Sequence, residues 1–215
     1  MLHNKQYILG KNAHIIDESW KTINLPNGYV VSYQNNLHIA HNIDNSIVLL
    51  GDVWQVDPER RDPVEIIQNW NGDTSLDEIF AQEEYWNGRY LIITNKWILT
   101  DTTSSLACFY NDNGYSSSLA LLQIVNNKPI IELPKMPIGC PQYVDFMPGR
   151  LTQYEDCFRL LPNQILNYQS GIITYRKLYY PTPKKNKEQC LDEFERLYLY
   201  SIHEMVKNYK NSKIW

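Results

Sequence analysis

One stretch, Trp86 to Tyr110, constrains the fold more than any other part of the sequence. Two apolar, β-branched runs, Tyr90–Thr94 and Trp97–Thr100, are separated only by the polar pair Asn95-Lys96. Such runs joined by a two-residue polar turn predict a β-hairpin. Both runs are apolar at almost every position, which is typical of strands covered on both faces. The sequence therefore predicts that this hairpin is the inner pair of a sheet.

Further short apolar runs predict strands on both sides of this hairpin, and the 16 Tyr and 6 Trp of the chain favour strands as well. Upstream we expect an antiparallel meander with a hairpin turn at Gln34–Asn36 and a last strand that stops at Gly51. Downstream, Gln169-Ser170-Gly171 predicts another hairpin. Residues 116–125 fit either a short helix or a strand, and the proline-rich residues 129–140 fit a loop or an edge. The predicted strands are Tyr7–Ile16, Tyr29–Tyr33, Leu37–Ala40, Ser46–Leu50, Gln164–Tyr168 and Ile172–Tyr175.

Two helices are predicted between the sheet-forming regions. Asp62 followed by Pro63 is typical of a helix start, and we expect a helix over Pro63–Trp70 that buries Val64 and Ile67. Ser75 followed three residues later by Glu78 forms a capping box, which predicts a second helix. Because these helices lie between strands, we expect them to pack on a sheet face.

The C-terminal part of the sequence predicts a change of domain. Residues 1–180 form the first domain, and residues 181–187 have the composition of a linker. A long amphipathic helix is predicted from Glu188 to about Tyr209, because apolar residues recur every three or four positions. Ile214-Trp215 resembles the first residues of a strand. We therefore expect residues 188–215 to begin a second domain that continues beyond this chain.

Composition excludes several classes of function. The net charge of −4 and an isoelectric point near 5.7 give no electrostatic basis for binding nucleic acid or an anionic membrane. The four cysteines, Cys108, Cys140, Cys157 and Cys190, lack the spacing of a zinc site, so we expect no metal and a reducing, cytoplasmic setting. We also expect no signal peptide and no membrane span, because no apolar run is long enough.

Four segments, taken in order, resemble one known family. Ile47–Trp54 is similar to a strand that ends in Asn-Gly-Glu-Ile/Val-Tyr, and Tyr85–Ile93 is similar to an L-x-G-x-F-A strand with Gly88 at its glycine. Trp97–Tyr110 resembles l-x-R-D-x-x-G-x-x-P-L-Y-Y, with Asp101 at its aspartate. Phe158–Leu166 resembles I-x-x-L-P-P-G-x-x-L and is followed by Arg176–Tyr180, which is similar to a closing R-Y-W.

These segments resemble the N-terminal domain of the asparagine synthetase family, a class II glutamine amidotransferase with an Ntn-hydrolase fold. The resemblance implies an α+β fold, a four-layer αββα sandwich of mainly antiparallel sheets, plus the C-terminal helix. It also implies an ATP-pyrophosphatase (synthetase) domain, as a C-terminal domain or partner chain, which adenylates a carboxyl group and passes it to an amine. ATP and Mg are thus implied only for that domain, and no cofactor for this chain. Family members such as lasso-peptide cyclases form amides or peptide rings, so a peptide or small-molecule substrate is implied.

The sequence departs from this family where the chemistry lies. The family's nucleophile is an N-terminal Cys exposed by removal of Met1, but residue 2 is Leu2. The family's Asn-Gly oxyanion pair is matched by Leu50 and Gly51, so the side-chain amide is missing. The R-G-P-D segment that holds the glutamine carboxylate has no counterpart. We therefore expect a glutaminase domain without activity and without catalytic residues, whose relic pocket comprises Leu50, Gly51, Asn87, Gly88 and Asp101.

Two alternatives stay open. The first is a stand-alone binding module that holds a small molecule or peptide in the relic pocket, with Asp101 as the polar group and Tyr90, Trp54 and Trp86 as walls. The second is a hydrolase in which processing makes Ser19, Thr22 or Ser32 the N-terminal nucleophile.

Overall fold

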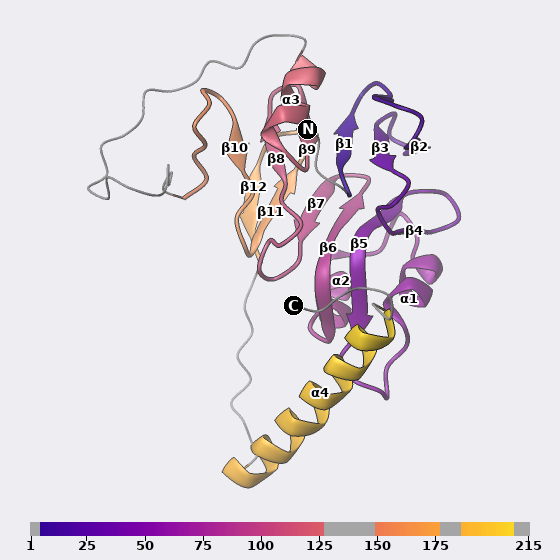
Figure 1. The fold of residues 1–215 in the computed structure, drawn as a ribbon, viewed down its shortest axis with the longest axis vertical. Coiled ribbons are helices and arrows are strands. Elements are labelled where there is room, and N and C mark those ends of the chain that lie inside the picture. Colours follow the sequence, from indigo (N-terminus) through magenta and orange to yellow (C-terminus); the bar gives the residue numbers. More distant parts are fainter. Residues whose placement is uncertain (1–4, 127–148, 177–185, 209–215) are drawn as a thin grey trace, which may run out of the picture.

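The computed structural model describes residues 5–126, 149–176 and 186–208. In this part of the chain, twelve strands form two six-stranded sheets in which every strand pair is antiparallel, and four helices accompany them. The two sheets lie face to face in Figure 1, with the C-terminal helix projecting from one end. The predicted α+β class of mainly antiparallel sheets with a C-terminal helix is confirmed.

The first sheet has the order β10-β8-β9-β1-β3-β2. It joins N-terminal strands to strands from the middle and the C-terminal part of the chain. β1 lies in its interior, paired with β9 on one side and β3 on the other. The strands are β1 (Tyr7–Gly10), β2 (Trp20–Asn24), β3 (Val30–Gln34), β8 (Phe109–Asn111), β9 (Gly114–Ser116) and β10 (Phe158–Arg159).

The second sheet has the order β12-β11-β7-β6-β5-β4, and it contains the hairpin predicted from Trp86 to Thr100. Within that hairpin Ile92 lies opposite Leu99 and Ile93 lies opposite Ile98. The hairpin is an inner pair, as predicted, because β5 covers one edge and β11 the other. The strands are β4 (Ile39–His41), β5 (Ile47–Gln55), β6 (Trp86–Thr94), β7 (Trp97–Thr100), β11 (Gln164–Asn167) and β12 (Ile173–Tyr175).

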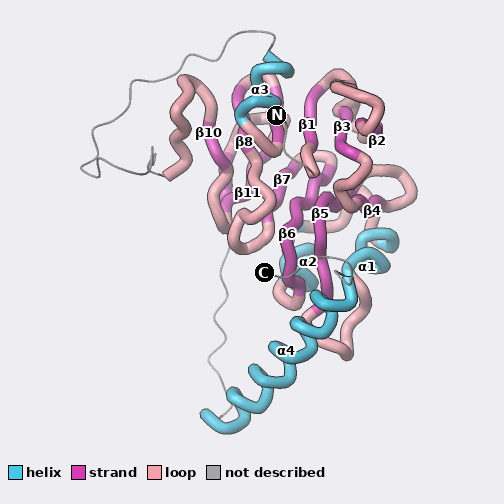
Figure 2. Tube along the Cα trace, viewed as in Figure 1, coloured by secondary structure: helices cyan, strands magenta, loops and turns pink. Residues whose placement is uncertain are grey.

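The second sheet is buried on both faces, which explains its continuous apolar runs. Alternate residues such as Leu91 and Ile93 enter the core between the two sheets, while Ile92 and Leu99 pack against helices on the opposite face. Those helices are α1 (Pro63–Asn69) and α2 (Leu76–Glu83), whose buried residues include Ile67 and Ile79. The helix α3 (Leu119–Asn126) covers the outer face of the first sheet. The layers are therefore helix, sheet, sheet and helix, and Figure 2 shows α1, α2 and α3 beside the strands.

The helix starts follow their sequence signals. Asp62 accepts a hydrogen bond from the Val64 backbone N–H at 2.8 Å, and Ser75 and Glu78 form the predicted capping box. The predicted burial of Val64 is wrong: α1 buries Pro63, Ile66 and Ile67 instead, and Val64 is 37% exposed. The reason is that α1 is only two turns long and rests on the sheet edge at β4 and β5 through its other face.

Three strand predictions need correction, and the first is the predicted strand Tyr7–Ile16, which ends at Gly10. β3 and β4 do not form a hairpin, because Leu37 is buried between the sheets and the chain crosses there from the first sheet to the second. A meander within one sheet is therefore wrong. β5 does not stop at Gly51 but continues to Gln55, paired with β6 throughout. Residues 116–125, which fitted either a helix or a strand, contain the end of β9 and most of α3.

The C-terminal helix α4 (Lys187–Asn208) confirms the predicted long helix. Most of the apolar side chains that define its amphipathic pattern are exposed in this structure: Leu191, Phe194, Tyr198, Ile202 and Val206. Residues 181–185 of the predicted linker, residues 129–140 and the predicted strand start at Ile214-Trp215 lie outside the described residues. Lys187, the last residue of the predicted linker, already belongs to α4.

Candidate functional site

The relic pocket predicted from the sequence falls on the β5–β6 ribbon, where two glycines allow the strands to approach closely. Gly51 and Gly88 have positive φ angles of 104° and 137°. A Cβ atom at Gly51 would lie 2.2 Å from the Arg89 carbonyl oxygen, and one at Gly88 would lie 2.1 Å from the Asp52 carbonyl oxygen. These glycines are therefore required by the backbone itself, and a strand-ending bend at Gly51 is excluded.

The groups that match the family's oxyanion hole are engaged inside the protein. The Gly51 N–H donates a hydrogen bond to the carbonyl oxygen of His38 at 2.8 Å. The Leu50 side chain is fully buried in the core between the sheets. Neither residue therefore presents a donor to a bound carbonyl group.

Asp52, the next residue of β5, holds two cationic or potentially cationic side chains. Its carboxylate accepts a hydrogen bond from Lys5 Nζ at 2.7 Å and contacts His38 Nδ1 through its other oxygen. Lys5 immediately precedes the buried Gln6 and β1, so the pair joins the N-terminal segment to β5. This ion pair occupies the end of the sandwich where β1 begins.

Asp101 caps its own turn. Its carboxylate accepts hydrogen bonds from the Thr103 N–H at 2.9 Å, the Ser105 N–H at 3.0 Å and the Leu106 N–H at 3.3 Å. The side chain of Asp101 is buried, with 2% of the residue exposed. Of the two roles open to it, a ligand for an amine or a cap on the turn after β7, the geometry shows the second.

Asn87 lies at the surface and contacts the C-terminal helix. Its side-chain amide donates to Ser201 Oγ at 3.2 Å, and Trp54 Nε1 donates to the same oxygen at 3.0 Å. Trp54 therefore lies under α4. Trp86 and Tyr90 lie instead in the cluster that packs against α1 and α2. The three aromatic residues expected to wall one pocket thus do not surround a common space.

Tyr90 instead belongs to a buried polar cluster that sequence reasoning missed. Its hydroxyl donates to Glu83 Oε1 at 3.0 Å, and Arg176 Nη2 lies 2.9 Å from Glu83 Oε2. Burial raises the pKa of Glu83, and the neighbouring Arg176 opposes that shift. The ion pair of Glu83 and Arg176 joins α2 to the C-terminal strands. Hydrophobic periodicity could not predict it, because Glu83 is the only charged residue on the buried side of α2.

The described cysteines give no nucleophile at this site. Cys108 is fully buried, and burial raises the pKa of its thiol to about 12. Cys157 is buried as well. Cys190 is exposed on α4, eleven residues before Ser201, which corresponds to about 16 Å along the helix. An N-terminal Ser19, Thr22 or Ser32 would require removal of β1, an interior strand of the first sheet whose residues are fully buried.

Two of the hollows in the described part of the chain bear on a binding site. The smaller, about 280 Å³, adjoins Gly51 and Trp54 on β5, Asp62 before α1, and Glu204 and Lys207 on α4. The larger, about 740 Å³, lies at the end of the sandwich where β1 finishes, and none of its lining residues is among the site residues predicted from the sequence. Within the described residues, no group of three or more His, Cys, Asp or Glu side chains is arranged to hold a metal ion. None of the described helices combines the length and apolar character needed to cross a membrane.

Comparison of the chain with models of known protein families gives no match, and comparison with curated proteins gives none either.

Proposed function

We propose that this chain is the catalytically inactive, glutamine-amidotransferase-like domain of an ATP-dependent, amide-forming protein of the asparagine synthetase family. Its Ntn-hydrolase-type sandwich would act as a cytoplasmic scaffold or substrate-holding domain for a synthetase domain. The observation that carries this proposal is the internal pairing of the relic pocket. The Gly51 N–H binds His38, Asp52 binds Lys5, and Asp101 caps its own turn.

The layering supports the fold assigned in this proposal. Two antiparallel sheets share one core, and helices cover both outer faces, which is the arrangement that the resemblance implies. The close-approach glycines also fall at Gly51 and Gly88, the positions that resemble the glycines of the family motifs. The chain thus has the layering and the glycines that the resemblance implies, but it lacks the N-terminal cysteine nucleophile.

The exposed apolar face of α4 supports a partner at the C-terminal end. Phe194 and Tyr198 stack with ring centroids 5.6 Å apart while both rings face solvent. Ser201 holds the other side of the helix to β5 and β6. Burying such an apolar face against the synthetase domain would remove a surface that is costly to leave in water.

The proposal is tested by two measurements. The purified chain is incubated with glutamine and assayed for glutamate, and we expect none above the buffer blank. The reading frame after Trp215 in the source gene is then determined, and we expect a strand followed by an S-G-G-x-D-S segment. Glutamine hydrolysis would overturn the inactive assignment, and a stop codon after Trp215 would exclude a synthetase domain on the same chain.

A second candidate is a stand-alone binding module, and the hollow of about 280 Å³ beside Gly51 favours it. Its lining combines the carboxylates of Asp62 and Glu204 with Lys207, so it offers both signs of charge to a small polar ligand or peptide. A stop codon after Trp215, together with ligand-induced changes in the NMR signals of Gly51 and Trp54, would support this reading over the first.

A further inference from the structure

The larger cavity lies at the opposite end of the sandwich from the relic pocket. Lys11 and Asn12, which follow the last residue of β1, line it, whereas Lys5, which binds Asp52, precedes the first residue of β1. The β8–β9 turn, the β11–β12 turn and the segment of Arg150 and Phe158 also contribute to its lining. Its volume of about 740 Å³ is within the usual range for small-molecule sites. It is therefore a separate site, independent of any glutamine chemistry.

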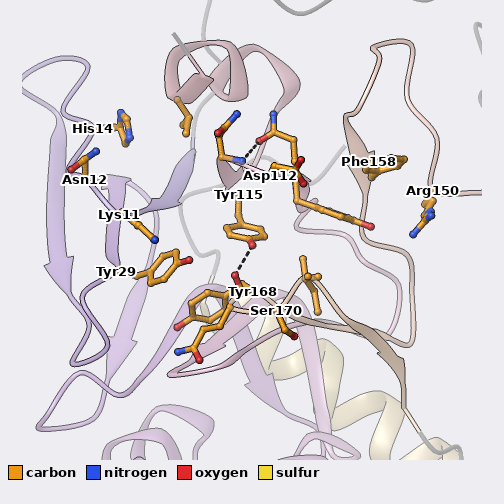
Figure 3. Close-up of a pocket in the computed structure, with 17 residues that line it drawn as sticks. Lys11, Asn12, His14, Tyr29, Asp112, Tyr115, Arg150, Phe158, Tyr168 and Ser170 are labelled. Carbon is orange, nitrogen blue, oxygen red and sulfur yellow. Dashed lines mark hydrogen bonds between the residues drawn. The ribbon is translucent and has the colours of Figure 1, made fainter. Parts of the chain in front are cut away.

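Aromatic rings form two walls of this cavity. On one side Tyr168 makes edge contacts with Tyr29 and Tyr115, with ring centroids 4.9 Å and 5.9 Å apart. On the other side the rings of Tyr110 and Phe158 lie 5.7 Å apart. In Figure 3, Phe158 faces the Tyr29, Tyr115 and Tyr168 group across the open space. A planar ring between the walls would meet aromatic surface on both sides.

Hydrogen bonds hold the first wall in place. Tyr115 donates its hydroxyl to the backbone carbonyl of Tyr168 at 2.7 Å, and Tyr168 donates its own hydroxyl to the carbonyl of Thr94 at 2.7 Å. Because both hydroxyl protons are used internally, these residues offer ring surface rather than hydrogen-bond donors to the cavity. The wall is rigid and suits an apolar ring.

The charged side chains around the cavity favour an anion with a single charge. Arg150 and Lys11 are cationic and lie on opposite sides of the opening in Figure 3, and among the described residues of the lining Asp112 is the one acid. Burial lowers the pKa of His14, so its imidazole is neutral at pH 7. The lining thus has a net charge of about +1 on a chain whose net charge is −4.

Arg150 is placed to receive that anion. Its guanidinium lies over the Phe158 ring, 4.9 Å from the ring centroid, and it partly opposes the rise in the pKa of Tyr110 that burial causes. A stacked guanidinium keeps its N–H donors in one plane, which matches a carboxylate. Arg150 is otherwise exposed. A ligand whose carboxylate binds at the mouth would therefore place its own aromatic ring inside the cavity.

We propose that this cavity binds an aromatic monocarboxylate: a ring that enters between the Tyr168 and Phe158 walls and a carboxylate held by Arg150, while Lys11 across the opening adds to the positive potential. A free aromatic acid and the C-terminal aromatic residue of a peptide share this chemistry. A phosphate monoester fits less well, because it carries nearly two negative charges whereas the described lining has a net charge of about +1.

The test is isothermal titration calorimetry with four probes. N-acetyl-L-phenylalanine carries the ring and the charge, N-acetyl-L-phenylalaninamide lacks the charge, and acetate lacks the ring. We expect the acid to bind about tenfold or more tightly than either of the other two, because a charge-assisted hydrogen bond is worth at least that factor. The peptide Gly-Gly-Gly-Phe separates the two sources: tighter binding than the acid indicates a peptide C-terminus, and weaker binding indicates a free acid.

Two variants and a matched control complete the experiment. R150Q and K11Q each change an exposed side chain, so the fold is retained. R150Q should weaken binding of the acid about tenfold, and K11Q, which removes a charge on the opposite side of the opening, should weaken it less. R60Q is the control, because Arg60 also lies over an aromatic ring, 3.2 Å from the Tyr85 centroid, but outside the cavity. Equal affinity for acid and amide, no heat with the acid up to about 10 mM, or equal effects of R150Q and R60Q would each overturn the proposal. None of these results depends on the assay for glutaminase activity.

Discussion

Trp54 on β5 and Ser201 on α4 are joined by a hydrogen bond of 3.0 Å, although 147 positions separate them in the sequence. The bond is buried, and Asn87 donates to the same serine oxygen. The two hydrogen bonds therefore fix the C-terminal helix to β5 and β6, the two longest strands of the second sheet. This contact lies where the Gly51–Gly88 ribbon extends beyond the sandwich.

Replacing Ser201 by alanine should release α4 from the sheet. The change leaves the buried Trp54 N–H without this partner, so we expect a loss of about 1–2 kcal/mol of stability. Hydrogen exchange should become faster in α4 while β6 and β7 stay protected. Glu195, exposed on the same helix, provides the control variant E195A. If S201A and E195A exchanged alike, the anchoring role of Ser201 would be wrong.

Replacing Gly51 by alanine should damage the fold far more than replacing Gly28. Both residues have a positive φ, but a Cβ at Gly28 meets no atom within 4 Å, whereas one at Gly51 would collide with the Arg89 carbonyl. We expect G28A to cost about 1–2 kcal/mol, from the backbone conformation alone, and G51A to cost more than about 4 kcal/mol or to prevent folding. Urea unfolding of the two variants makes the comparison, and equal midpoints would rule out a steric role.

The D101N variant distinguishes a turn cap from a ligand. Because the carboxylate of Asp101 accepts backbone hydrogen bonds from Ser105 and Leu106, an amide in its place turns one acceptor into a donor facing N–H groups. We expect a loss of about 1–3 kcal/mol. Glutamine at 10 mM, on the order of saturation for a weak site, should leave the melting temperature of the unmodified protein unchanged. A rise in that temperature, abolished in D101N, would restore the ligand role.

The ion pair of Glu83 and Arg176 makes a prediction about pH. The pKa of Glu83 is raised above its ordinary value of 4.5, first by burial. Its contribution to stability is therefore fully present below the unfolded pKa and is lost as the pH rises through the raised folded pKa. The unfolding free energy of the unmodified protein, minus that of E83Q, should fall as the pH is raised from about 4 to 7. A difference that grows with pH would show instead that Arg176 lowers the pKa of Glu83 below its ordinary value.

A second variant tests whether Glu83 and Arg176 stabilise the protein as an ion pair. R176M removes the cation that opposes the buried Glu83 carboxylate, and breaking such a pair costs about 3–5 kcal/mol. R159M provides a control, because Arg159 is an exposed arginine on β10, which belongs to the first sheet. The loss in R176M should shrink at low pH, where Glu83 is protonated, and a loss independent of pH would assign it to packing of Arg176 over Phe80.

Local signals in the sequence determined the elements whose boundaries depend on neighbouring residues. The β6–β7 hairpin follows from two apolar runs and a polar turn, the α2 start follows from Ser75 and Glu78, and the length of α4 follows from its periodicity. These features form through contacts within a few positions, so the order of residues is enough to predict them. The two glycines on β5 and β6 were also visible in the sequence.

Only the tertiary structure decided which sheet each strand joins and what each polar group binds. The turn after β3 looks like a hairpin, but burial of Leu37 between the sheets sends β4 to the other sheet. The N–H of Gly51 and the carboxylate of Asp101 had open roles until the positions of His38 and Leu106 were known. The aromatic cavity brings together Lys11, Arg150 and Tyr168, although Lys11 lies more than one hundred positions before the other two in the sequence. Such pairings depend on packing between distant segments, which no local pattern encodes.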